Sequence, residues 1–126
     1  PYAQIQSNVR RYHTNVLDAT KKYISYLNFQ KNNLEKLENT LLISYEELTD
    51  NSIHTKEKIV KFLPELNDIN FNLKFNAHNM LEKKEMGITN LNQKSIESLS
   101  NDQIQSINSI LKKEKNLLDF FNYTII

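Results

Sequence analysis

The sequence contains no cysteine, no tryptophan, one glycine and two prolines in 126 residues. Without cysteine, the chain forms no disulfide, performs no thiol catalysis and offers no thiolate to zinc. With one glycine, it has no glycine-rich phosphate loop. A sheet protein of this length needs many tight turns, which favour glycine and proline. The shortage therefore excludes most all-β and α/β folds and favours long helices with few connections.

The sequence also has almost no excess of one charge sign, because it contains 16 lysines and arginines and 15 aspartates and glutamates. The basic clusters are short, as on solvated helix faces. These clusters are Arg10–Arg11, Lys21–Lys22 and Lys112–Lys113 with Lys115. A nucleic-acid-binding protein normally concentrates basic residues on one face, so we expect no nucleic acid partner.

Long hydrophobic runs are absent too, because no apolar run approaches the roughly 18 residues that span a bilayer. We expect membrane association only through flanking segments that this sequence does not contain. Residue 1 is not methionine and no signal peptide is visible, so we expect a mature form or an excised domain.

Residues 2–49 contain neither glycine nor proline and carry apolar residues at alternating spacings of three and four. This seven-residue pattern is typical of coiled-coil helices. The pattern shifts between Tyr23 and Leu27, as a four-residue insertion would shift it without breaking the helix. We therefore expect one helix over residues 2–49, about 70 Å long. A turn at Asn32–Asn33 is the alternative and would give two helices.

The middle of the chain predicts shorter helices. Four small polar residues, Thr49–Ser52, indicate a loop. Pro64 suits the first turn of a helix, where its missing amide donor is harmless. Gly87 suits the position just beyond a helix C-terminus. We therefore expect helices near residues 55–62 and 64–86.

The last helix has the clearest start signal in the sequence. After the polar segment 88–99, Ser100 and Gln103 have the spacing of a capping box. Leu99 and Ile104 occupy the two positions of a hydrophobic staple. The sequence therefore predicts a helix that begins directly after Ser100.

These segments predict an all-α protein without a sheet, as a single helical-bundle domain over residues 1–126. The bundle is antiparallel, with three helices if residues 2–49 stay whole and four if they split. We expect its core to include aliphatic residues of the heptad stripes. They are Leu34, Leu41, Ile59, Leu66, Leu73, Leu111 and Leu118.

Few residues are placed for chemistry. His78 and Glu82 would share one face of a helix, but a zinc site needs three or four ligands and nothing marks a third. Glu46 and Glu47 are adjacent and point to different faces, so they cannot share a proton. No glycine-lined turn presents a nucleophile. We therefore expect a non-enzymatic protein with no metal, no cofactor and no catalytic residue.

The predicted first helix carries an apolar stripe that two shorter helices cannot fully cover. Tyrosine is enriched at protein interfaces, so this stripe is the candidate surface for a protein partner or for self-association. In the alternative, the last helix folds back over the stripe and its side chains are core. The stripe consists of Tyr2, Ile5, Val9, Tyr12, Val16 and Tyr23.

The excess of asparagine, lysine and isoleucine suggests an AT-rich genome. Asparagine- and lysine-rich helical segments without glycine, such as residues 28–34, resemble the helical secreted or surface proteins of malaria parasites. This resemblance implies an extracellular protein that acts by protein–protein contact in host-cell traversal or invasion. The chain also resembles the extracytoplasmic four-helix domains of bacterial chemoreceptors and sensor kinases. In such a domain, a membrane helix would follow an apolar end like residues 120–126. That alternative implies ligand sensing.

Overall fold

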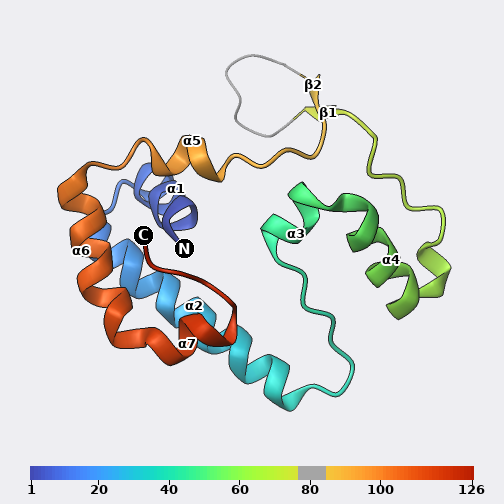
Figure 1. The fold of residues 1–126 in the computed structure, drawn as a ribbon, viewed down its shortest axis with the longest axis horizontal. Coiled ribbons are helices and arrows are strands. Elements are labelled where there is room, and N and C mark those ends of the chain that lie inside the picture. Colours follow the sequence, from blue (N-terminus) through green and yellow to red (C-terminus); the bar gives the residue numbers. More distant parts are fainter. Residues whose placement is uncertain (77–84) are drawn as a thin grey trace. The chain divides into compact units, whose positions relative to one another are not determined.

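The computed structural model describes residues 1–76 and 85–126. It is mostly helical, which confirms the all-α class (Figure 1). The chain forms two compact units. Unit 1 contains Pro1–Glu38 and Leu91–Ile126, and unit 2 contains Asn39–Asn90. The expectation of one domain over residues 1–126 stays a prediction.

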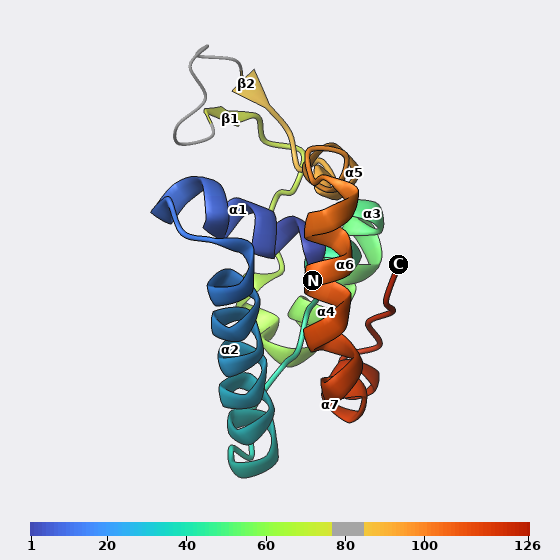
Figure 2. The same ribbon diagram turned by 90° about the vertical axis from the view of Figure 1, so that its left-hand side faces the viewer.

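Unit 1 consists of short helices that pack around one long helix. Figure 2 shows α2 and α6 side by side and running in the same direction, and α1 lying across the first turns of α2. The Lys31 ammonium near the C-terminus of α2 lies 5.1 Å from the Phe120 ring of α7, as this direction requires. The predicted antiparallel arrangement is therefore wrong for this pair. The helices are α1 (Tyr2–Tyr12), α2 (Val16–Lys36), α5 (Asn92–Ile96), α6 (Asn101–Leu111), the 3₁₀-helix η2 (Lys112–Glu114) and α7 (Lys115–Phe120).

The prediction of one helix over residues 2–49 is wrong, and so is the alternative turn at Asn32–Asn33. The chain leaves the helix at His13, which adopts left-handed backbone angles (φ 50°, ψ 38°). Asn15 then caps α2, because its side chain accepts a hydrogen bond from the Asp18 amide at 2.9 Å. A second interruption follows α2, where residues 37–44 form no helix. At the first interruption, asparagine capping by Asn15 competes with helix continuation, and apolar spacing does not reveal it.

The core of unit 1 comes from both ends of the chain. Leu111 and Leu118 are buried in it, as predicted. Leu66 and Leu73 are exposed, so their assignment to the core is wrong, and the other three predicted core residues are half-buried. The buried hydrophobic residues are Tyr2, Ile5, Ala19, Tyr23, Leu27, Leu99, Ile107, Leu111, Leu117 and Leu118.

Unit 2 begins with two short helices in contact with each other, α3 (Tyr45–Asp50) and α4 (Ser52–Phe62). The helix expected near residues 55–62 is confirmed within α4. The loop expected at Thr49–Ser52 is reduced to Asn51, whose side chain caps α4 by accepting from the His54 amide at 3.4 Å.

The helix expected over residues 64–86 is wrong for residues 67–76 and 85–86, and residues 77–84 lie outside the described part of the chain. Pro64 does start a helical turn, but this 3₁₀-helix, η1, spans only Pro64–Leu66. The Asn70 side chain then accepts from the Asn72 amide at 2.9 Å, a local turn that competes with helix formation. The strands β1 (Phe75–Asn76) and β2 (Glu85–Met86) pair antiparallel, so Gly87 follows a strand. Among the described residues, this short ladder is the exception to the expected absence of a sheet.

The predicted capping box at the last helix is confirmed. The Ser100 hydroxyl accepts from the Gln103 amide at 3.2 Å, and the Gln103 side chain accepts from the Ser100 amide at 2.9 Å. Leu99 is buried and Ile104 packs against the same core, as the staple requires. Local sequence alone therefore places this helix start correctly.

Replacing Ser100 with alanine should lower the free energy of unfolding by about 0.5–2 kcal/mol, whereas aspartate should cost almost nothing. The reason is that aspartate also accepts from the first-turn amides and alanine does not. Chemical denaturation followed by circular dichroism measures both variants. Equal stability of the alanine and aspartate variants would contradict the prediction.

Candidate functional site

The apolar stripe predicted as an interface lies mainly inside unit 1. The structure buries Tyr2, Ile5 and Tyr23 in the core, so their assignment to an interface is wrong and the core alternative accounts for them. Val9 and Val16 are half-buried and pack against the same core. The residue of this stripe that remains open to solvent is Tyr12. The helices that cover these residues are α5, which contacts α1, and α6, which contacts α2.

A different aromatic surface is exposed on α1 and α2. Tyr12, Tyr26 and Phe29 keep 54%, 48% and 65% of their surface exposed. Lys22, Tyr26 and Phe29 have the i, i+4, i+7 spacing that places side chains on one helix face. The Lys22 ammonium lies 4.5 Å from the Tyr12 ring centre and 5.8 Å from that of Tyr26. These four residues, Tyr12, Lys22, Tyr26 and Phe29, are called the aromatic stripe below.

Backbone geometry explains how Tyr12 joins side chains of the next helix. The left-handed turn at His13 ends α1, and the cap at Asn15 starts α2 directly afterwards. The Tyr12 ring then lies beside Lys22, and the Arg11 guanidinium lies 5.7 Å from the same ring. Each such cation–π contact contributes about 0.5–1 kcal/mol at an exposed site. The contacts therefore hold the rings and cations together on the surface.

The apolar pattern predicted over residues 2–49 does not separate the exposed Tyr26 and Phe29 from the buried face of α2. The signal that could have separated the two faces is the run of buried positions Ala19, Tyr23 and Leu27, spaced by four. Lys22, Tyr26 and Phe29 fall beside that run. Aromatic residues lie on two faces of α2, one buried and one exposed. A single apolar pattern over residues 2–49 does not distinguish these two faces.

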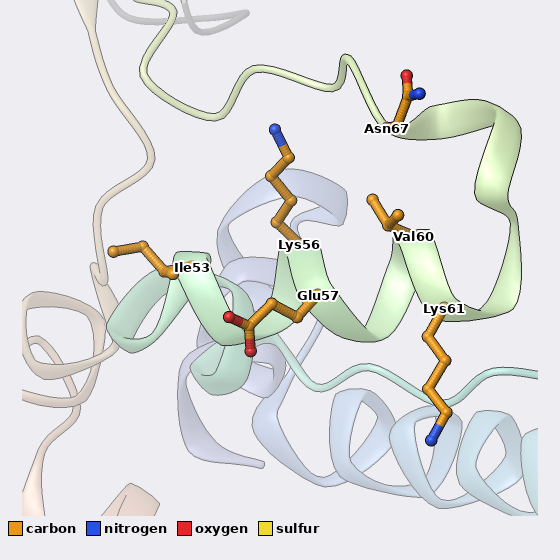
Figure 3. Close-up of a pocket in the computed structure, with 6 residues that line it drawn as sticks. All are labelled: Ile53, Lys56, Glu57, Val60, Lys61 and Asn67. Carbon is orange, nitrogen blue, oxygen red and sulfur yellow. The ribbon is translucent and has the colours of Figure 1, made fainter.

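Unit 2 contains an open hollow of about 540 Å³ beside α4. Figure 3 shows Lys56 and Val60 pointing toward the segment that carries Asn67, while Lys61 points the other way. The walls are mostly hydrocarbon, so the hollow suits an apolar side chain better than a polar metabolite. Its lining residues are Ile53, Lys56, Glu57, Val60, Lys61 and Asn67.

Glu47 has a structural use in unit 2. Its carboxylate accepts from the Ser44 amide at 2.9 Å and from the Lys58 ammonium at 2.6 Å. The hydrogen bond from Lys58, followed by that from Ser44, lowers the pKa of Glu47. The buried Thr55 hydroxyl also lies 2.8 Å from the Glu47 carbonyl oxygen, to which it can donate. Glu47 therefore caps α3 and ties it to α4, an arrangement that supports the fold of unit 2.

The possible metal pair His78 and Glu82 lies outside the described residues. Within residues 1–76 and 85–126, no three histidine, aspartate or glutamate side chains gather closely enough to hold a metal ion. In the same two ranges, no helix has both the length and the apolar character needed to cross a bilayer.

No protein family, curated protein or solved structure matches the chain. The resemblance to helical surface proteins of malaria parasites stays a prediction, and so does the bacterial sensor alternative.

Proposed function

We propose that this chain is a non-enzymatic protein that acts by binding another protein, and that the aromatic stripe is its contact surface. The observation that carries this proposal is the exposure of Tyr12, Tyr26 and Phe29 together. Single exposed apolar residues are ordinary, but grouped ones mark interaction sites. Tyrosine and phenylalanine are also enriched in interface cores.

The surrounding structure supports this proposal. The long helix α2 is packed into unit 1 through its buried residues Ala19, Tyr23 and Leu27. In this proposal, unit 1 acts as a small helical bundle that holds the stripe in one arrangement. A surface that is rigid before binding loses less conformational entropy on association. The proposed setting is extracellular, in host-cell traversal or invasion, because the chain's composition and helical style resemble proteins of that kind.

Serine replacements at Tyr26 and Phe29 together test the proposal. Both side chains are exposed, so the free energy of unfolding should change by no more than about 0.5 kcal/mol each. Binding should be lost, since the replacements remove most of the apolar contact area. Thermal melts check folding. Sedimentation over a concentration range reports self-association, and quantitative capture from a host-cell surface extract reports binding of other proteins.

Serine at Leu42 and Leu73 provides the matched control, because these unit 2 residues are also exposed and apolar and do not line the hollow beside α4. The control should retain both self-association and captured proteins. A stripe variant that melts normally and binds as the unmodified chain does would refute the proposal. A large loss of stability in the stripe variant would show that the two rings belong to the core.

A further inference from the structure

We infer that the segment bound at the aromatic stripe is an acidic polypeptide segment with apolar side chains beside its carboxylates. This inference rests on the proposed function and names the chemistry of the partner. It starts from the charges around the stripe. Between residues 10 and 34 the chain has five lysines and arginines and one carboxylate, although its net charge is +1.

The cations at the stripe differ from other lysines of the chain in their partners. Lys31, Lys58 and Lys115 each pair with a carboxylate. In the part of the chain that the structure describes, Arg11 and Lys22 have aromatic rings as neighbours and no carboxylate partner. Contact with a ring face leaves most N–H groups of an ammonium or guanidinium free to donate. These groups can therefore bind carboxylates of a partner.

The one carboxylate between residues 10 and 34 does not cancel this charge. Asp18 lies in the first turn of α2, where the helix dipole favours a negative charge. It also accepts from the Asn15 side-chain amide at 2.7 Å. The stripe thus offers cations at Arg11 and Lys22 and exposed rings at Tyr26 and Phe29. A segment with carboxylates beside apolar side chains complements both features.

A continuous polyanion fits the stripe less well. Arg10, Arg11, Lys21 and Lys22 all lie near the junction of α1 and α2, whereas the residues on either side of Phe29 in the sequence are the uncharged Asn28 and Gln30. Nucleic acid binding depends on cations that follow a phosphate backbone over several nucleotides. An anionic membrane surface favours a helix whose apolar face is free to insert. The main apolar face of α2 is instead buried in unit 1. The observations therefore favour a short acidic protein segment.

The probe for this inference is a fluorescently labelled random copolymer of glutamate and tyrosine, titrated with the full chain and followed by anisotropy. A lysine–tyrosine copolymer is the charge-reversed probe. We expect the glutamate copolymer to bind at least about tenfold more tightly and to weaken as salt is raised. Oligothymidylate and phosphatidylserine vesicles, used at matched charge, should bind more weakly than the glutamate copolymer.

Two pairs of variants separate the stripe from general charge. Replacing Arg11 and Lys22 with glutamate should weaken glutamate-copolymer binding at least about tenfold, because it reverses both cations at the stripe. The same change at Lys112 and Lys113 alters net charge equally on exposed residues of η2 and should have a much smaller effect. Glutamine at Arg11 and Lys22 should show an intermediate loss, and circular dichroism confirms that each variant is folded.

Each remaining outcome overturns the inference in a recognisable way. Equal binding of the two copolymers, lost in the Tyr26 and Phe29 serine variant, would retain a protein-binding stripe without acidic preference. Tighter binding of oligothymidylate or of vesicles would assign the stripe to that ligand. If the η2 variant and the stripe variant lose equal affinity for the glutamate copolymer, the binding depends on net charge and not on the stripe. No binding of the glutamate copolymer would also refute the inference, while capture from the cell-surface extract judges the proposed function separately.

Discussion

Replacing Leu111 with alanine is expected to lower the free energy of unfolding by about 2–5 kcal/mol. Leu111 has no exposed surface and lies at the end of α6, in the core of unit 1. Truncation removes buried carbon atoms and leaves a cavity that the neighbouring helices fill only in part. Urea denaturation followed by the helical circular dichroism signal measures the loss through the shift of the transition midpoint.

The matched control is alanine at Leu73, where the side chain is 62% exposed. The same atoms are removed there, but little of their surface leaves water on folding, so the change should stay within about 0.5 kcal/mol. Both leucines belong to seven-residue series in the sequence. Equal losses at the two positions would show that the core is assigned wrongly and that the heptad pattern describes it better.

The features predicted correctly are those that depend on a few neighbouring residues. Ser100 and Gln103 determine where α6 begins, because the capping hydrogen bonds join residues only three apart. Pro64 determines where η1 begins, because proline suits the first turn of a helix. The scarcity of glycine likewise predicts the all-α class without reference to long-range contacts.

The features predicted wrongly depend on contacts between distant residues or on weak local competitors. An apolar period of seven continues through His13 and Asn15, yet a left-handed turn and an asparagine cap end one helix and start another there. The same period places Leu66 and Leu73 in a core, although the helix that would carry them ends at Leu66. Periodicity describes which face a helix would present, and it does not show where that helix stops.

The candidate site could be predicted only in part for the same reason. Tyr12 was identified from the sequence, but as one member of a stripe whose other tyrosines are buried by residues almost a hundred positions away. Its neighbours in the folded chain, Lys22 and Tyr26, follow from the turn between α1 and α2. Phe29 is exposed because another face of α2 packs against α6. Neither the grouping around Tyr12 nor the exposure of Phe29 can be predicted from the spacing of residues along the sequence.

The buried Tyr2 hydroxyl lies in a closed hydrogen-bond network that joins distant parts of unit 1. It donates to the Asn108 side-chain oxygen of α6 and accepts from the Ile126 amide at 3.1 Å. The Asn108 side-chain nitrogen in turn donates to the Ile126 carbonyl oxygen at 2.7 Å. The network therefore fastens α1, α6 and the segment after α7 to one another. Burial raises the pKa of Tyr2, and the amide of Ile126 opposes this shift.

Replacing Tyr2 with alanine should cost about 3–5 kcal/mol, because it removes both a core ring and the network. Phenylalanine keeps the ring and should cost about 1–3 kcal/mol, the penalty for leaving the Asn108 side-chain oxygen and the Ile126 amide without the Tyr2 hydroxyl. The raised pKa means that folding favours the neutral phenol. The contribution of Tyr2 is therefore complete below the unfolded-state pKa of about 10 and is lost as pH rises through the folded-state value.

Urea denaturation of the unmodified chain and the phenylalanine variant, on both sides of that pH, measures this contribution. The other five tyrosines ionise in both proteins and cancel in the difference. The stability gap between the two proteins should narrow in alkaline solution. A phenylalanine variant as stable as the unmodified chain would show that the network adds nothing beyond ring packing. A gap that widens with pH would mean that the folded state favours the phenolate, which contradicts the burial of the Tyr2 hydroxyl.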